Sequence, residues 1–165
     1  MTVGPVQMLV LGFSEPEFTG KIAAELDRLR DHDFVRIIDA LVVNKDDDGN
    51  VTALQVSDLT ADEASEMGAI AGALIGLGYG DVEAAEIGAE LGAAAGADGH
   101  LIPDEDVWYA ADVIPNGSAA VVLLLEHLWA IPLRDAIVDA GGVALADEWV
   151  HASDLLAVGV NAASE

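Results

Sequence analysis

Residues 64–96 read ASEMGAIAGALIGLGYGDVEAAEIGAELGAAAG, and the spacing of small residues in this stretch decides the fold. Residues four apart lie on the same side of an α-helix, so a small residue at every fourth position forms a ridge along it. Each glycine within a helix costs up to about 1 kcal/mol relative to alanine. Close approach of another helix backbone would offset that cost. The ridge contains Ala64, Gly68, Gly72, Gly76, Gly80, Ala84, Gly88, Gly92 and Gly96.

The ridge divides into two helices. Thr60-Ala61-Asp62-Glu63 matches a capping box, in which the first and last side chains satisfy the first amide groups of a helix. This helix is expected to end near residues 78–80, and a second helix is expected from Asp81 to about Ala97. Two helices joined by so short a connection predict a helical hairpin over residues 60–99.

The outer surface of the first helix is too apolar to be expected in contact with water. The helix is apolar all round between Met67 and Leu77, and Ile70 and Leu74 belong to this surface. A helix of this type is buried on every side or lies in lipid. The hairpin could therefore pack wholly within one chain, self-associate with a second copy, or contact lipid. The second helix instead carries an acidic stripe at spacings of three and four: Glu83, Glu86 and Glu90.

The segments on either side of the hairpin alternate between extended and helical patterns. Asp-Gly within residues 46–50 predicts a hairpin turn between two strands. The expected strands are Val6–Phe13, Val35–Asn44, Val51–Leu59, Ala119–Leu125 and a short Val143–Ala146; the expected helices are Thr19–His32, Pro103–Val113, Ile131–Ala140 and one that begins at Ser153.

Without the hairpin, the order is strand–helix–strand–strand–helix–strand, with a further helix and strand appended. This order predicts an α+β fold, and more specifically a ferredoxin-like sandwich into which the hairpin is inserted. The length of 165 residues fits a single domain, 1–165.

Four runs accompany the glycine ridge: GPVQMLVLGF (4–13), RIIDALVVNKDDDGNV (36–51), PNGSAAVVLLLEHLWA (115–130) and LRDAIVDAGG (133–142). From about Gly4 to Val158 the chain resembles an uncharacterised bacterial family of ferredoxin-like proteins that carry a glycine-zipper insertion, a domain of unknown function. The resemblance implies the same body and insertion. Because that family has no established activity, the resemblance implies no catalytic residues. Some members are described as membrane proteins with a longer apolar insertion, whereas the acidic stripe interrupts the second helix here.

The net charge of −24 comes from 30 acidic and 6 basic residues. Repulsion from phosphate excludes nucleic acid as a partner and opposes binding to anionic membranes. Divalent cations on the acidic surface, or a basic partner, are the ligands that this charge favours. The chain contains no cysteine, which excludes disulfides and cysteine–zinc sites.

A cytoplasmic location is expected. The longest uncharged apolar stretch, Met67–Gly80, has 14 residues. Its helical length of roughly 21 Å is shorter than a hydrocarbon layer of about 30 Å. The first residues, MTVGP, lack a basic region followed by an apolar core, so no signal peptide is expected.

The best polar cluster is Glu126-His127-x-Trp129 at the end of an apolar strand. A carboxylate beside a histidine can ligate a metal or transfer a proton. Neighbours on a strand point to opposite faces, however, so Glu126 and His127 would not converge. The competing interpretation is a strand end that becomes polar as it reaches solvent, with Arg134 as an ion-pair partner.

The other polar motifs indicate structural roles. His32, His100 and His151 lack metal-ligand spacing and are expected at surface or capping positions. Residues 44–49 resemble part of a calcium loop, but Gln55 stands where such loops have glutamate, which favours a solvated turn. Gly76-x-Gly78-x-Gly80 follows no strand, so it does not predict nucleotide binding. No histidine adjoins Ser14, Ser118 or Ser153, and Trp108, Tyr109 and Trp129 are expected as core or interface anchors.

These patterns favour a non-enzymatic protein that self-associates through its glycine-rich hairpin, with no cofactor. The expected interface contains Ile70 and Leu74 together with Gly68, Gly72, Gly76, Gly80, Gly88, Gly92 and Gly96. One alternative is a small-molecule or metal-binding protein, or an enzyme, that uses Glu126, His127 and Trp129. A second alternative is peripheral association with membranes through an opened hairpin.

Overall fold

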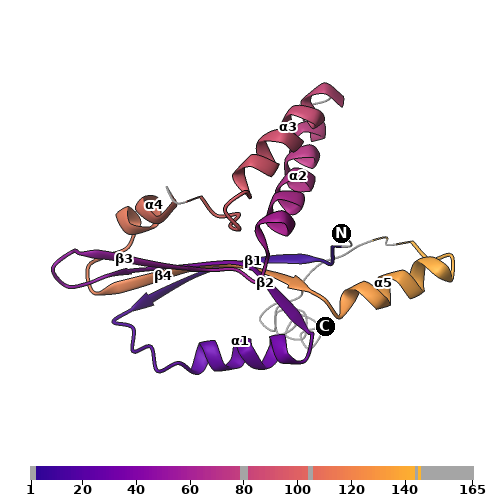
Figure 1. Cartoon of the computed structure of the whole chain (residues 1–165). Coiled ribbons are helices and arrows are strands. Elements are labelled where there is room, and N and C mark those ends of the chain that lie inside the picture. The colour runs from indigo at the N-terminus through magenta and orange to yellow at the C-terminus, as the bar shows by residue number, and fades with distance from the viewer. Residues whose placement is uncertain (1–2, 79–81, 104–105, 144, 146–165) are drawn as a thin grey trace, which may run out of the picture. The chain divides into compact units, whose positions relative to one another are not determined.

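A computed structural model describes residues 3–78, 82–103, 106–143 and 145. The chain divides into two compact units, Met1–Pro132 and Leu133–Glu165, and the first unit contains the whole sheet. The fold is α+β with a four-stranded antiparallel sheet (Figure 1). The elements in chain order are β1 (Val6–Ser14), α1 (Lys21–Asp31), β2 (Val35–Lys45), β3 (Val51–Val56), α2 (Ala61–Gly78), α3 (Val82–Ala95), α4 (Asp106–Val113), β4 (Ser118–His127) and α5 (Ala130–Asp139), which spans the junction of the two units.

The strand order in the sheet is β1-β4-β2-β3. The central strands β4 and β2 are nearly continuous runs of valine, leucine, isoleucine and alanine, as expected of strands covered on both faces. Their register places Val42 opposite Val121 and Leu41 opposite Val122. β1 and β3 form the two edges.

An irregularity in β2 reorients two side chains. Ile37 pairs with Leu125 and Asp39 pairs with Leu124, so β2 has one more residue than β4 at this point. In such a bulge two successive residues oppose a single residue of the partner strand. Ile38 and Asp39 therefore lie on the same face of the sheet, the face that carries the base of the hairpin.

Helices cover both faces of the sheet. On one face, Leu26 and Leu29 of α1 pack against a core of Val35, Ile37, Leu123 and Leu125. On the other face, Ala64 and Met67 at the start of α2 pack against Ile38, and Ala111 of α4 joins Leu41, Val43 and Ile102. Figure 1 shows α1 on one side of the sheet and α2, α3 and α4 on the other.

The element order within the first unit is β1-α1-β2-β3-α2-α3-α4-β4, and α5 begins at its end. The spatial arrangement differs from a two-layer ferredoxin-like sandwich, in which both helices cover one face. Here α1 and α4 lie on opposite faces, because Ala111 packs on Leu41 and Val43 whereas Leu26 packs on Val35 and Ile37.

α2 and α3 form an antiparallel hairpin whose backbones touch. A Cβ added to Gly72 would lie 1.9 Å from the carbonyl oxygen of Gly88, and one added to Gly92 would lie 1.9 Å from that of Gly68. A Cβ added to Gly76 would likewise lie 2.1 Å from the carbonyl oxygen of Ala84, and one added to Gly96 would lie 2.4 Å from that of Ala64. No side chain larger than hydrogen fits at these glycines without separating the helices. The close approach that the sequence predicted thus occurs within one chain.

The ends of the hairpin agree with the sequence pattern. The Glu63 amide donates to Thr60 Oγ1 over 3.2 Å and the Thr60 amide donates to Glu63 Oε2 over 2.9 Å, which confirms the capping box.

The turn between β2 and β3 is also confirmed, with Gly49 at φ +85°. Gly80, part of the expected strand Val143–Ala146, and the helix expected from Ser153 lie outside the described residues.

Candidate functional site

The outer face of α2 is apolar and open to solvent. By helical periodicity, Ile70, Leu74 and Leu77 lie opposite the glycine ridge, at spacings of four and three. All three side chains are exposed, Leu74 to 65%. We call Ile70, Leu74 and Leu77 the α2 outer stripe. The stripe is a row of large apolar side chains that are exposed to solvent.

The outer face of α3 is acidic. Glu83, Glu86 and Glu90 lie opposite the ridge of α3 and are exposed. Ile87 and Leu91 flank this face, and Leu91 is exposed to 67%. The two helices therefore share a glycine-to-glycine contact but present different chemistry outward. Among the described helices, none combines the length and the apolar character needed to cross a bilayer.

The expected interface residues divide into two groups. The described glycines of the ridge face the partner helix within the chain, so another molecule could reach them only if the hairpin opened. Ile70 and Leu74 project from the opposite side and are exposed. The expectation that the glycines themselves face a second copy therefore does not match the hairpin, because α3 already occupies their surface.

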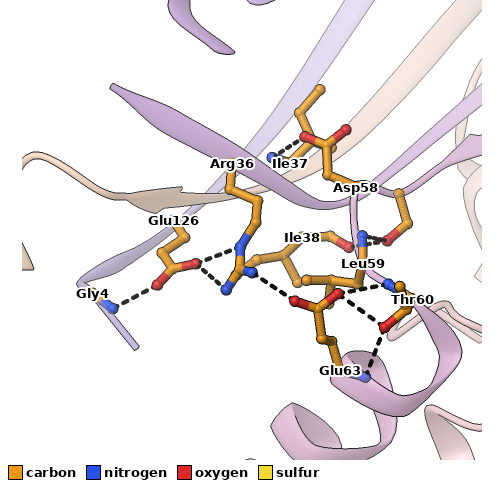
Figure 2. A network of polar contacts seen from close by, with 10 residues as sticks. Gly4, Arg36, Ile37, Ile38, Asp58, Leu59, Thr60, Glu63 and Glu126 are labelled. Atoms are coloured by element: carbon orange, nitrogen blue, oxygen red, sulfur yellow. Dashed lines mark hydrogen bonds and ion pairs between the residues drawn. The ribbon is translucent and has the colours of Figure 1, made fainter. Parts of the chain in front are cut away.

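Glu126 lies in a buried ion-pair network at the base of the hairpin (Figure 2). Its side chain is fully buried. Oε1 accepts a hydrogen bond from the Gly4 amide over 2.7 Å, and Oε2 accepts from Arg36 Nε over 2.8 Å and Nη2 over 2.7 Å. Arg36 Nη1 lies 3.3 Å from Glu63 Oε1. The network thus joins the amino-terminal segment, β4, β2 and the capping box of α2.

This geometry favours a structural role for Glu126. Both carboxylate oxygens are engaged, and a Cβ at Gly4 would lie 2.6 Å from the carbonyl oxygen of His127, so the chain approaches closely here. The ion-pair partner is Arg36, whereas the expected partner Arg134 pairs with Asp135. Arg36 could not be singled out from the sequence because 90 residues separate it from Glu126.

His127 lies on the opposite face of the sheet from Glu126, as expected for neighbours on a strand. It is buried, its Nε2 lies 3.2 Å from Gln7 Oε1, and its ring centroid lies 6.3 Å from that of Trp129. The structure therefore does not bring Glu126 and His127 together. In the described ranges, no three histidine, aspartate or glutamate side chains are grouped so that they could hold a metal ion.

Asp39 is a second buried carboxylate, which the sequence patterns did not single out. Its Oδ2 accepts from the amides of Leu101 and Ile102 over 2.7 and 2.8 Å and from Gln55 Nε2 over 2.9 Å. His100 Nδ1 lies 3.2 Å from Oδ1. Asp39 thus fastens the segment after α3 to the sheet. The available signal was one acidic residue in the apolar run RIIDALVV, residues 36–43.

The remaining motifs have structural partners. The Asp46 carboxylate accepts hydrogen bonds from the side chain and the amide of Asn50 over 2.8 and 2.7 Å, which lowers its pKa and closes the turn. His32 Nδ1 lies 2.8 Å from the carbonyl oxygen of Arg28 near the end of α1, as expected for a capping histidine. His151 and Ser153 lie outside the described residues. Trp108 and Tyr109 are largely exposed on α4, so the alternative that they anchor the core is wrong.

The chain matches no known family model, and neither the curated proteins nor the solved structures contain a significant match to it.

Proposed function

We propose that the protein is a non-enzymatic self-associating protein in which the α2 outer stripes of two copies pack together. The observation that carries this proposal is the exposure of Ile70, Leu74 and Leu77 on a helix whose other side is already packed against α3. Contiguous exposed apolar surface of this kind is typical of interaction sites. The glycine ridges then have a supporting role, since they join α2 and α3 into one unit.

A second copy fits the distribution of charge on the hairpin. If two α2 helices pack face to face, the acidic stripes of both α3 helices remain in water on the outer sides. The contact is then isologous, since each copy contributes the same residues about a two-fold axis. Anionic lipid offers a poorer fit, because the chain carries a net charge of −24 and the acidic stripe belongs to the same hairpin.

The sheet edges provide a second contact for larger assemblies. β1 is an edge strand, and its alternate residues Val6, Met8 and Val10 are exposed. An edge strand can pair with another chain through its free backbone groups. Pairing at this edge, combined with the two-fold contact of α2, would extend a dimer into a ring or a filament.

We propose that the fold is a variant of the ferredoxin-like body. The element order and the hairpin between β3 and α4 support a variant of the ferredoxin-like body with an insertion at residues 60–99. We also propose a relationship to the bacterial family with a glycine-zipper insertion, from the sequence of residues 4–13, 36–51, 115–130 and 133–142. A cytoplasmic location is the setting that we propose for this assembly.

Light scattering at high ionic strength tests the proposal, since salt screens the repulsion between acidic copies. The wild type should have the mass of a dimer or of a larger assembly, and Leu74→Glu should have the mass of a monomer. Leu91→Glu is the matched control, because Leu91 is equally exposed but lies on α3. A monomeric wild type would disprove self-association, and equal masses for the wild type and Leu74→Glu would disprove the assigned surface.

A further inference from the structure

A pocket of about 470 Å³ lies between α1 and the sheet, on the face opposite the hairpin. It is partly open to solvent. The volume lies within the range of small-molecule sites. The sheet wall is apolar and includes Ile37 and Leu54, and Ile22, Ala23 and Leu26 add to the lining from α1.

The pocket exists because α1 covers the sheet incompletely. None of the residues of α1 is buried, and Leu26 and Leu29 are the side chains of α1 that join the core beneath it. Nearer the start of the helix, Ile22 lines the pocket yet remains half exposed. On the sheet side, Leu54 lines the pocket and is exposed to 61%. Apolar surface on both walls therefore remains in contact with water.

The charges around the pocket do not select an ion. Four charged residues line it, and their formal charges cancel: Glu17, Lys21, Asp27 and Arg30. The Arg30 guanidinium is already paired with Asp27 and Asp58. An anionic head group would be repelled by the field of a chain with a net charge of −24. The same field attracts a cationic head group, but the pocket lining itself supplies no surplus of negative charge to pair with it, because Lys21 and Arg30 offset Glu17 and Asp27.

We infer that this pocket binds an uncharged, elongated apolar molecule, such as an alkyl or isoprenoid chain that ends in a hydroxyl or carbonyl group. The apolar walls bury the chain, and the polar group remains near the charged residues of the lining. The site is independent of self-association, because the α2 outer stripe lies on the opposite side of the sheet. The occupied pocket would bury Leu54 and Ile22, which are exposed without it.

Three ligands of equal chain length test the inference: decanol, decanoate and decyltrimethylammonium. Ligand-observed NMR and thermal unfolding would measure binding to the full chain. Decanol should bind with a stoichiometry of one per chain and raise the melting temperature, and each charged ligand should bind about tenfold more weakly or worse. Failure of decanol to bind, or equal affinity for a charged ligand, would overturn the inference.

A pair of neighbouring substitutions locates the binding site. Ala23→Trp fills the pocket and should abolish decanol binding, whereas Ala24→Trp adds the same bulk at the next residue, which does not line the pocket. Leu54→Lys provides a second test on the sheet wall, should the tryptophan variant fail to fold. Unchanged binding in Ala23→Trp or in Leu54→Lys would show that decanol binds elsewhere. Leu74→Glu should bind decanol normally, which separates this site from the assembly surface.

Discussion

At the scale of single residues, the buried ion pair between Glu126 and Arg36 connects four segments of the chain. Burial of a charge is costly unless hydrogen bonds and an opposite charge compensate it. Glu126 receives both, from the Gly4 amide and the Arg36 guanidinium. The hairpin is tied to the sheet by the same arginine, through Glu63.

Glu126→Gln should lower the free energy of unfolding by about 3 kcal/mol, because Arg36 would lose its buried carboxylate partner. Chemical denaturation measures this change. Glu25→Gln is the matched control, since it removes the same charge from an exposed pair with Arg28 and should have little effect. If the two variants lost the same stability, the network would have no special role.

The lowered pKa of the Glu63 carboxylate predicts that stability depends on pH. Hydrogen bonds from the Thr60 amide and hydroxyl lower its pKa, and Arg36 adds to this effect. A lowered pKa in the folded state stabilises the protein above the usual carboxyl pKa, and this stabilisation is lost as the pH falls through the folded value. In Glu63→Gln the acid limb of the stability profile should therefore be shallower. Unfolding curves recorded between neutral and acidic pH would measure it, and an unaltered limb would refute the assignment.

At the scale of elements, the hairpin was predictable because its signal is local. The four-residue period of glycine and the capping box at Thr60 both lie within one segment, and both are confirmed. The choice between packing within one chain and packing between chains was not predictable, since the same ridge serves either contact. Ile70 and Leu74 were expected at the interface from the sequence, but their separation from the glycine contact follows from the packing of α3 on the ridge.

Other features of the elements depend on contacts between distant parts of the chain. The bulge in β2 adds one residue to a strand whose apolar pattern shows no interruption beyond Asp39, so its effect on Ile38 could not be foreseen. The element order also leaves open which face each helix covers. The side chains of α1 and α4 settle this by packing on opposite faces. The Arg36 partner of Glu126 was hidden by its distance in sequence.

The interior and the last residue of α2 permit a matched test of the glycine contact. Gly72→Ala should destabilise the protein by about 1–3 kcal/mol, because its Cβ would meet the backbone of Gly88 and force the helices apart. Gly78→Ala has no atom within 4 Å of the new Cβ. It should be neutral, or stabilising by up to about 1 kcal/mol from helix propensity. Thermal unfolding compares the pair, and equal effects would mean that the ridge is not tightly packed.

At the scale of the whole molecule, the net charge opposes association of two copies, whereas the exposed apolar surface favours it. Each copy carries a net charge of −24, which repels a second copy over a distance set by the salt concentration. Burial of the apolar α2 outer stripe favours association of the two copies. Association through α2 reconciles the two, because it buries the stripe while the acidic face of α3 stays in water.

Disulfide cross-linking tests this central claim most directly, because the chain contains no cysteine that would compete. Leu74→Cys places one thiol in the middle of the α2 outer stripe, and Leu91→Cys places one on α3 at nearly the same exposure. On mild oxidation at high ionic strength, Leu74→Cys should form a covalent dimer within minutes, and Leu91→Cys should remain largely monomeric. Equal cross-linking of both variants, or cross-linking of Leu91→Cys alone, would contradict assembly through α2.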